Sequence, residues 1–320
     1  MATYKEINGT AVQNVAGDPS NPVEGEVWYN STSGAFKVLQ NNPGSWATGG
    51  ALGTARYSLA GAGTQTAALA FGGYSPSFSV STESYDGTSW TAVNPMNIAR
   101  TKLAGCGLSN TAALGFGGYS GGKKSETESY NGTNWTAVNP LGTARYALAG
   151  AGTNTLALGF GGYSPGARNE TESWNGTNWT AVNPLNTARY YFAGAGVNNT
   201  AALAFGGGFP ITAVTELWNG TNWATVNPMN TARYGVSGAG TQTSALAMSG
   251  TGGAPGTDAE SWNGTNWTTV ANMSTSRYYA GDAGANNTSA LIFGGSPQAA
   301  VLGATEEWNS GPVTKTITTT

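Results

Sequence analysis

Six arginines and six glutamates recur at a regular spacing, and they are the residues that could do chemistry together. The arginines are Arg56, Arg100, Arg145, Arg189, Arg233 and Arg277, and the glutamates are Glu83, Glu128, Glu172, Glu216, Glu260 and Glu306. The arginines follow one another every 44 or 45 residues. A carboxylate present in every unit suits a structural role better than catalysis, and a partly buried charge needs a partner. We expect the glutamates to hold the arginines; the alternative is a ring of carboxylates around a cation.

The chain contains no histidine. This excludes Ser-His-Asp and Cys-His nucleophile systems and galactose-oxidase-like copper chemistry. The single cysteine, Cys106, lies among small uncharged residues and is expected to be structural. A carboxylate-only mechanism remains, as in glycosidases or sugar mutarotases, and Asp258 and Asp282 are the notable carboxylates outside the repeat. We expect no catalytic residue, no cofactor and no metal.

Each arginine marks the start of one repeated unit. A stretch of small residues follows it, then an apolar run ending in paired glycines, a Glu two residues before an aromatic, and a Trp. In the first unit this pattern predicts strands over 57–63, 67–72, 81–85 and 90–93. Asp86-Gly87 predicts a tight hairpin between the last two strands, because both residue types tolerate a positive φ. No segment has helical periodicity, so we expect almost no helix.

These repeats resemble kelch repeats. The resemblance covers about residues 46–309 and implies an all-β, six-bladed kelch-like β-propeller. The repeat is shorter than the kelch period of about 50 residues. Shorter hairpins explain the difference, since only four residues separate Tyr85 from Trp90. We expect an N-terminal arm and β-hairpin over 1–45, the propeller over 46–312 and a C-terminal tail over 313–320.

Closure of the ring is predicted from an isolated Trp phrase. Trp46 and the residues that follow it match the end of a repeat, but no matching strand precedes them. The sixth unit reaches Trp308 and then lacks its own Trp phrase. We expect the Trp46 strand to be the outermost strand of the last blade; the alternative is that residues 313–319 fill that place.

The loops after the paired glycines differ between units, whereas the Asn-Gly hairpins are nearly identical. Variable loops on a rigid scaffold are typical of binding surfaces. They also contain aromatic rings and cations outside the repeat pattern. The candidate ligand-binding residues are Tyr74, Phe78, Tyr119, Lys123, Lys124, Tyr163, Arg168 and Phe209. An alternative is that these loops differ because nothing constrains them.

Composition limits the partners. The formal net charge is −3, and the chain has no extended basic cluster, so nucleic acid is not expected as a partner. Neither a secretion signal nor a membrane span is apparent, and we expect a protein made in a cytoplasm without membrane insertion. The 49 glycines and 13 prolines are balanced by 11 Trp, 14 Tyr and 9 Phe, so the chain should fold.

The segment over residues 21–34 reads NPVEGEVWYNSTSG. A hairpin is expected here, with strands over 27–30 and 35–39. The segment resembles stretches near the start of tail-fibre and other virion structural proteins of tailed phages. This resemblance implies a non-catalytic component of a phage tail, present in several copies, with other virion proteins and a host-surface glycan as partners. The alternatives are a carbohydrate-processing enzyme such as a mutarotase, and an intracellular adaptor, which the absence of a preceding helical domain disfavours.

Overall fold

The computed structural model describes residues 12–208, 210–252, 256–297 and 300–317, and within these ranges it contains strands and no α-helix. The chain forms two compact units. One is the segment Trp46–Asn309, and the other combines the described residues up to Ser45 with those from Ser310 onward.

The smaller unit is built on a β-hairpin. Strand β2 (Val27–Asn30) pairs antiparallel with the start of β3 (Ala35–Gly49), as the sequence predicts, and β1 (Gln13–Val15) lies parallel to β2. Asp18 accepts hydrogen bonds from Asn30 Nδ2 at 2.8 Å and Trp28 Nε1 at 3.0 Å, and these bonds lower the pKa of its carboxyl group. Residues 310–316 form the end of strand β26, so part of the expected tail is a strand.

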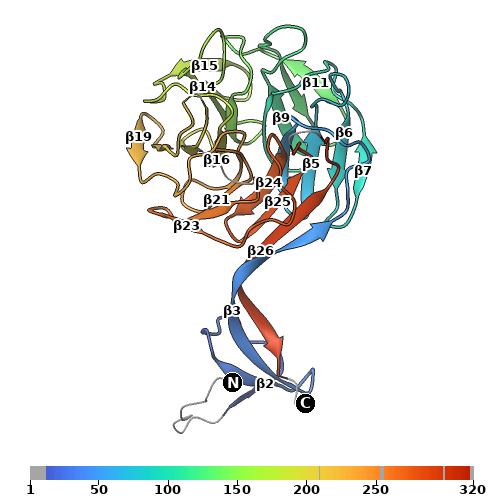
Figure 1. Ribbon diagram of the computed structural model, residues 1–320. Coiled ribbons are helices and arrows are strands. Elements are labelled where there is room, and N and C mark those ends of the chain that lie inside the picture. The colour runs from blue at the N-terminus through green and yellow to red at the C-terminus, as the bar shows by residue number, and fades with distance from the viewer. Residues whose placement is uncertain (1–11, 209, 253–255, 298–299, 318–320) are drawn as a thin grey trace. The chain divides into compact units, whose positions relative to one another are not determined.

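The larger unit is a six-bladed β-propeller (Figure 1). Each blade is a sheet of four strands, numbered here in chain order from its innermost strand. Blade 1 consists of β4 (Ala60–Thr64), β5 (Ala67–Phe71), β6 (Thr82–Tyr85) and β7 (Trp90–Val93). Blade 2 consists of β8 (Ala104–Ser109), β9 (Ala112–Phe116), β10 (Thr127–Tyr130) and β11 (Trp135–Val138). Blade 3 consists of β12 (Ala149–Gly152), β13 (Ala157–Phe160), β14 (Thr171–Trp174) and β15 (Trp179–Val182).

The other three blades repeat this order. Blade 4 consists of β16 (Ala193–Asn198), β17 (Ala201–Phe205), β18 (Thr215–Trp218) and β19 (Trp223–Val226). Blade 5 consists of β20 (Ser237–Gly240), β21 (Ala245–Met248), β22 (Ala259–Trp262) and β23 (Trp267–Thr269). Blade 6 consists of β24 (Gly281–Asn286), β25 (Ser289–Phe293), the first part of β26 (Thr305–Thr316) and the last part of β3.

Blade 6 closes the ring with strands from both ends of the propeller sequence. The Trp46 part of β3 lies beside β26, and the rings of Trp46 and Trp308 are 5.3 Å apart between centroids. Trp46 Nε1 also donates a 2.8 Å hydrogen bond to the carbonyl of Ala271. The prediction of closure through the Trp46 strand is confirmed, and residues 313–316 do not take that place.

The strands of the first unit lie close to their predicted positions, with one difference. The innermost strand begins at Ala60 instead of residue 57. Tyr57 forms an isolated bridge with Tyr74, and Ser58 has a φ of 50°. A residue in the left-handed region interrupts an extended strand, so the ladder starts only after this turn.

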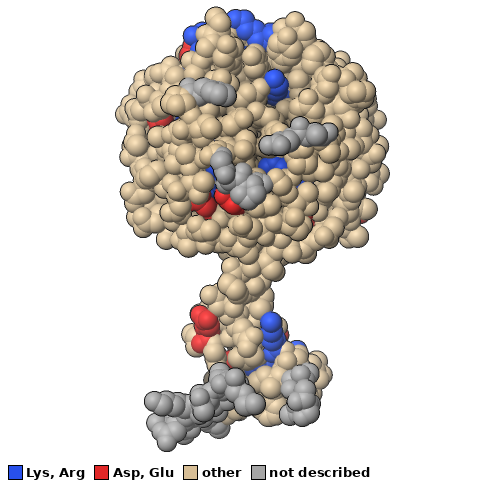
Figure 2. All heavy atoms as spheres, viewed as in Figure 1, with Lys and Arg blue, Asp and Glu red and all other residues tan. Residues whose placement is uncertain are grey.

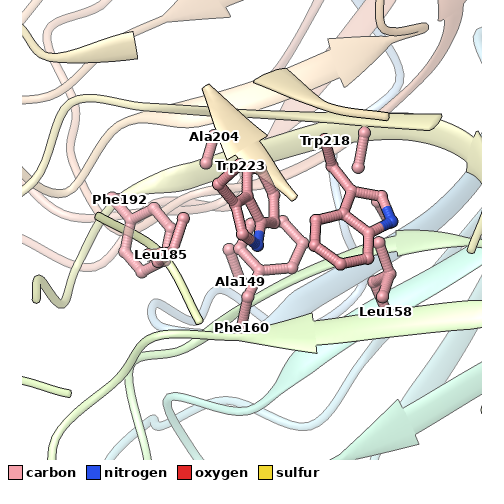
Figure 3. Packing of buried hydrophobic residues seen from close by; sticks show 10 residues of the cluster. Ala149, Leu158, Phe160, Leu185, Phe192, Ala204, Trp218 and Trp223 are labelled. Carbon is pink, nitrogen blue, oxygen red and sulfur yellow. The ribbon is translucent and has the colours of Figure 1, made fainter. Parts of the chain in front are cut away.

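The core lies between the blades. In most blades, the Trp that begins the outermost strand packs against a Phe of the preceding blade; Trp223, for example, lies 5.0 Å from Phe160 between ring centroids. Trp223 Nε1 also donates to Thr171 Oγ1 at 3.0 Å in that blade. Figure 3 shows Trp218 and Trp223 packed with Leu158 and Phe160. Burying such rings contributes about 2–3 kcal/mol each.

Candidate functional site: the tyrosine face and the axial mouth

The repeating arginines and glutamates form six buried ion pairs. The nitrogen-to-oxygen distances are 2.5–3.0 Å, and each pair lies within one blade. The second carboxylate oxygen accepts a backbone N–H; Glu83 Oε2, for example, accepts from Gly53 at 2.6 Å. Burial lowers the pKa of Arg189 to about 10, and the nearby Glu216 opposes this shift. The glutamates are therefore occupied by arginine and backbone and do not form a ring around a cation.

The arginine main chain, rather than its side chain, connects neighbouring blades. The carbonyl of Arg100 accepts a 2.8 Å hydrogen bond from Gly73, the second of the paired glycines in blade 1. Its guanidinium group instead contacts Glu128 of blade 2 at 2.8 Å. The same bond recurs around the ring and closes between Gly295 and the Arg56 carbonyl at 3.0 Å. Each arginine segment thus fixes one blade against the next.

The predicted aromatic residues of the variable loops lie together on one face of the propeller. Tyr74 and Tyr163 form bridges with Tyr57 and Tyr146, the residues that follow two of the repeating arginines. Tyr119 forms the corresponding bridge with Thr101. We call the connected aromatic side chains the tyrosine face: Tyr57, Tyr74, Phe78, Tyr119, Tyr146, Tyr163 and Tyr190. Successive rings in this series are 5.1–5.9 Å apart between centroids. All seven side chains are half-buried, so part of each remains open to a ligand.

The predicted cations of these loops are engaged with neighbouring side chains. Lys123 Nζ donates to Ser164 Oγ at 2.7 Å, Lys124 lies 3.5 Å from Glu126, and Arg168 lies 3.4 Å from Glu170. Phe209 lies outside the described residues. Charged side chains are sparse over the propeller surface seen in Figure 2. Any contact made by the tyrosine face would therefore depend mainly on ring surfaces and hydroxyl groups.

A closed circle of six backbone hydrogen bonds surrounds the propeller axis beside the tyrosine face. It joins the residues two positions after each arginine: Ser58, Lys102, Ala147, Tyr191, Gly235 and Tyr279. Each amide donates to the carbonyl of the equivalent residue in the preceding blade, at 2.7–3.1 Å. We call this circle the axial mouth; its residues and their immediate C-terminal neighbours line a cavity of about 90 Å³.

The axial mouth was not predicted from the sequence. Its six residues differ in type between blades, and five have side chains despite φ values of 50–56°. Lys102 Nζ lies 5.4 Å from the ring centroid of Tyr146 and 5.5 Å from that of Tyr191. The rings of Tyr191 and Tyr279 are 4.7 Å apart. The variability two residues after each arginine was the available signal.

A second cavity, of about 280 Å³, follows the axis between the innermost strands. Glycine and alanine form most of its lining, and among the described lining residues Asp282 alone is charged. Asp282 occupies the position that is Gly61, Gly105, Gly150, Gly194 or Gly238 in the other blades. Its Oδ2 accepts a 3.2 Å hydrogen bond from the Gly238 amide, and burial raises the pKa of its carboxyl group to about 7. A lone carboxylate does not supply the acid and base that sugar chemistry needs.

Other candidate chemistry receives no support from the geometry. Within the described ranges, no three acidic or cysteine side chains are grouped so that they could hold a metal ion. Cys106 is buried, and burial raises its thiol pKa to about 12, which is typical of an unreactive cysteine. The described chain has no helix of sufficient length and hydrophobicity to cross a membrane. Neither a protein-family model nor a curated protein matches the chain.

Proposed function

We propose that this protein is a non-catalytic binding module of a phage tail or tail fibre, and that it contacts a host-surface glycan through the tyrosine face. The continuous series of half-buried rings from Tyr57 to Tyr190 carries this proposal. Aromatic faces stack on the apolar faces of sugars, and tyrosine hydroxyl groups supply hydrogen bonds. Their rigid side chains lose little conformational entropy on binding.

The phage context rests on the resemblance of residues 21–34 to virion structural proteins, and the kelch type of the propeller rests on the repeat pattern. Glycan binding at one such face is expected to be weak. Several copies on one particle would raise the overall attachment by avidity. A neighbouring virion protein is the other partner considered for this face.

The test is binding of the purified protein to host cells and to an array of glycans. A triple variant, Tyr74→Ala, Tyr119→Ala and Tyr163→Ala, should lose binding. The matched control is Thr91→Ala, Thr136→Ala and Thr180→Ala, which changes exposed residues of outermost strands. Unchanged binding by the tyrosine variant would overturn the assignment to this face. Binding to virion proteins without any glycan signal would indicate an assembly role instead.

A further inference from the structure

The axial mouth contains polar groups that have no partner within the protein. Ser58 is 6% exposed, and its Oγ has no hydrogen-bond partner among the described residues. A buried hydroxyl group without a partner costs roughly 1–3 kcal/mol. Ser58 lines the 90 Å³ cavity, so a ligand in that cavity lies where it could satisfy this hydroxyl.

Lys102 lies next to Ser58 in the circle of backbone hydrogen bonds. The Lys102 amide donates to the Ser58 carbonyl at 2.8 Å. Its Nζ contacts the rings of Tyr146 and Tyr191 but has no ion pair or hydrogen bond among the described residues. An ammonium group has three N–H donors, and ring faces do not replace a hydrogen-bond acceptor. In this respect Lys102 differs from Lys123, Lys124 and Arg168, which are already paired.

The backbone at these positions is strained. Glycine would relieve the strain of a φ near 55°, yet only blade 5 has glycine, at residue 235. A side chain in the left-handed region costs about 1–2 kcal/mol. Strain of this kind that is retained at a cavity indicates that the side chains themselves are used. Here the retained groups are a hydroxyl, an ammonium and two tyrosine rings.

We propose that the axial mouth binds the carboxylate of an acidic sugar, with Ser58 Oγ and Lys102 Nζ as donors. This inference rests on the proposed glycan-binding function and names its ligand class. A carboxylate accepts hydrogen bonds from both groups and neutralises the lysine. A cavity of about 90 Å³ holds such a substituent rather than a whole sugar, so the pyranose ring lies outward against the tyrosine face. Burial raises the pKa of Tyr191 to about 12, so this phenol stays neutral and repels no anion.

The experiment compares glucuronate with glucose, two pyranoses that differ only in a carboxylate at C6, each displayed on polymer beads. The intact protein should bind the glucuronate beads about tenfold more tightly, which is the usual gain from a charge-assisted hydrogen bond. Lys102→Met keeps the aliphatic stem, removes the charge, and should abolish the preference. Lys123→Met is the control and should leave the preference unchanged.

Ser58→Ala separates a binding role from a structural one. Removing a buried hydroxyl without a partner should raise the melting temperature, whereas loss of a donor should lower affinity for glucuronate and leave glucose unchanged. Equal binding of both sugars by the intact protein, or an unchanged preference in Lys102→Met, overturns the acidic-sugar site. If the triple tyrosine variant still loses glycan binding, the proposed function survives that result. Absence of binding to any glycan refutes both proposals.

Discussion

The Ser58 amide donates a 2.7 Å hydrogen bond to the carbonyl of Tyr279, residues from the first and last blades. This bond closes the circle of six at the axial mouth, and the bond from Gly295 to the Arg56 carbonyl closes a second one. Closure therefore involves main-chain bonds near the axis as well as the pairing of β3 with β26. Because every blade contacts two neighbours, no blade edge near the axis lacks a partner.

The buried ion pairs should contribute strongly to stability. Arg189 is 1% exposed and pairs with Glu216 at 3.0 Å, so Arg189→Ala leaves a buried carboxylate without its cation. We expect a loss of about 3–5 kcal/mol in the free energy of unfolding, measured by urea denaturation. Arg168→Ala breaks a partly exposed pair and should cost under about 0.5 kcal/mol. Similar losses in both variants would contradict this account.

The left-handed residues of the axial mouth predict opposite effects of two small substitutions. Gly235 has a φ of 67°, and an added Cβ would lie 3.0 Å from Tyr279 Cε1, so Gly235→Ala should destabilise by about 1–2 kcal/mol. Ala147 has a φ of 54°, and Ala147→Gly should stabilise by up to about 1 kcal/mol. Thermal unfolding measures both. A destabilised Ala147→Gly variant would show that the left-handed backbone carries little strain.

The sequence was sufficient to predict the blades because each strand type has its own local signal. Paired glycines end the second strand, Asp86 and its Asn counterparts build the tight hairpin, and each Trp begins an outermost strand. Closure through Trp46 was also predictable, because the isolated Trp phrase had no other strand to complete. These signals depend on near neighbours in the chain, which a sequence displays directly.

The axial mouth could not be predicted in the same way. Lys102 lies in a phrase that otherwise looks like part of a strand, and only the folded ring shows its left-handed φ of 56°. Its neighbours Tyr146 and Tyr191 come from other repeats and are brought together by the circle of blades. The cations that the sequence did single out, such as Lys123, have local partners that the loop sequences do not reveal.

Trp46 should be needed for a closed ring. Its indole packs on Trp308 and bonds to Ala271, so Trp46→Ala removes contacts with both blade 6 and the segment that enters it. We expect a loss of about 2–3 kcal/mol and a rise in light scattering, since a loosened outermost strand exposes the edge of β26. Thr48→Ala, an exposed position on the same strand, is the control. A Trp46→Ala variant that unfolds like the intact protein would indicate that backbone pairing alone closes the ring.

Asp282 should make stability depend on pH. The residue borders the axial cavity, but its carboxylate lies between β20 and β24, where burial raises its pKa from 3.8 to about 7. Between pH 4 and pH 7 the unfolded chain releases this proton while the folded protein keeps it. Unfolding is therefore increasingly favoured as pH rises, by at most about 1.4 kcal/mol per pH unit. Above pH 7 both states are ionised and the penalty remains constant.

Asp282→Asn removes the titrating group and keeps the acceptor for the Gly238 amide. The variant should match the intact protein near pH 4 and unfold at a clearly higher temperature at pH 8. Asp86→Asn is the control, because Asp86 is exposed and its pKa is lowered by hydrogen bonds from the Ser89 and Thr88 amides. Asn also occupies this position in most of the other repeats, so the turn should tolerate the change. If Asp282→Asn and Asp86→Asn gave the same profile of melting temperature against pH, the Asp282 carboxylate would have to be solvated through the axial cavity.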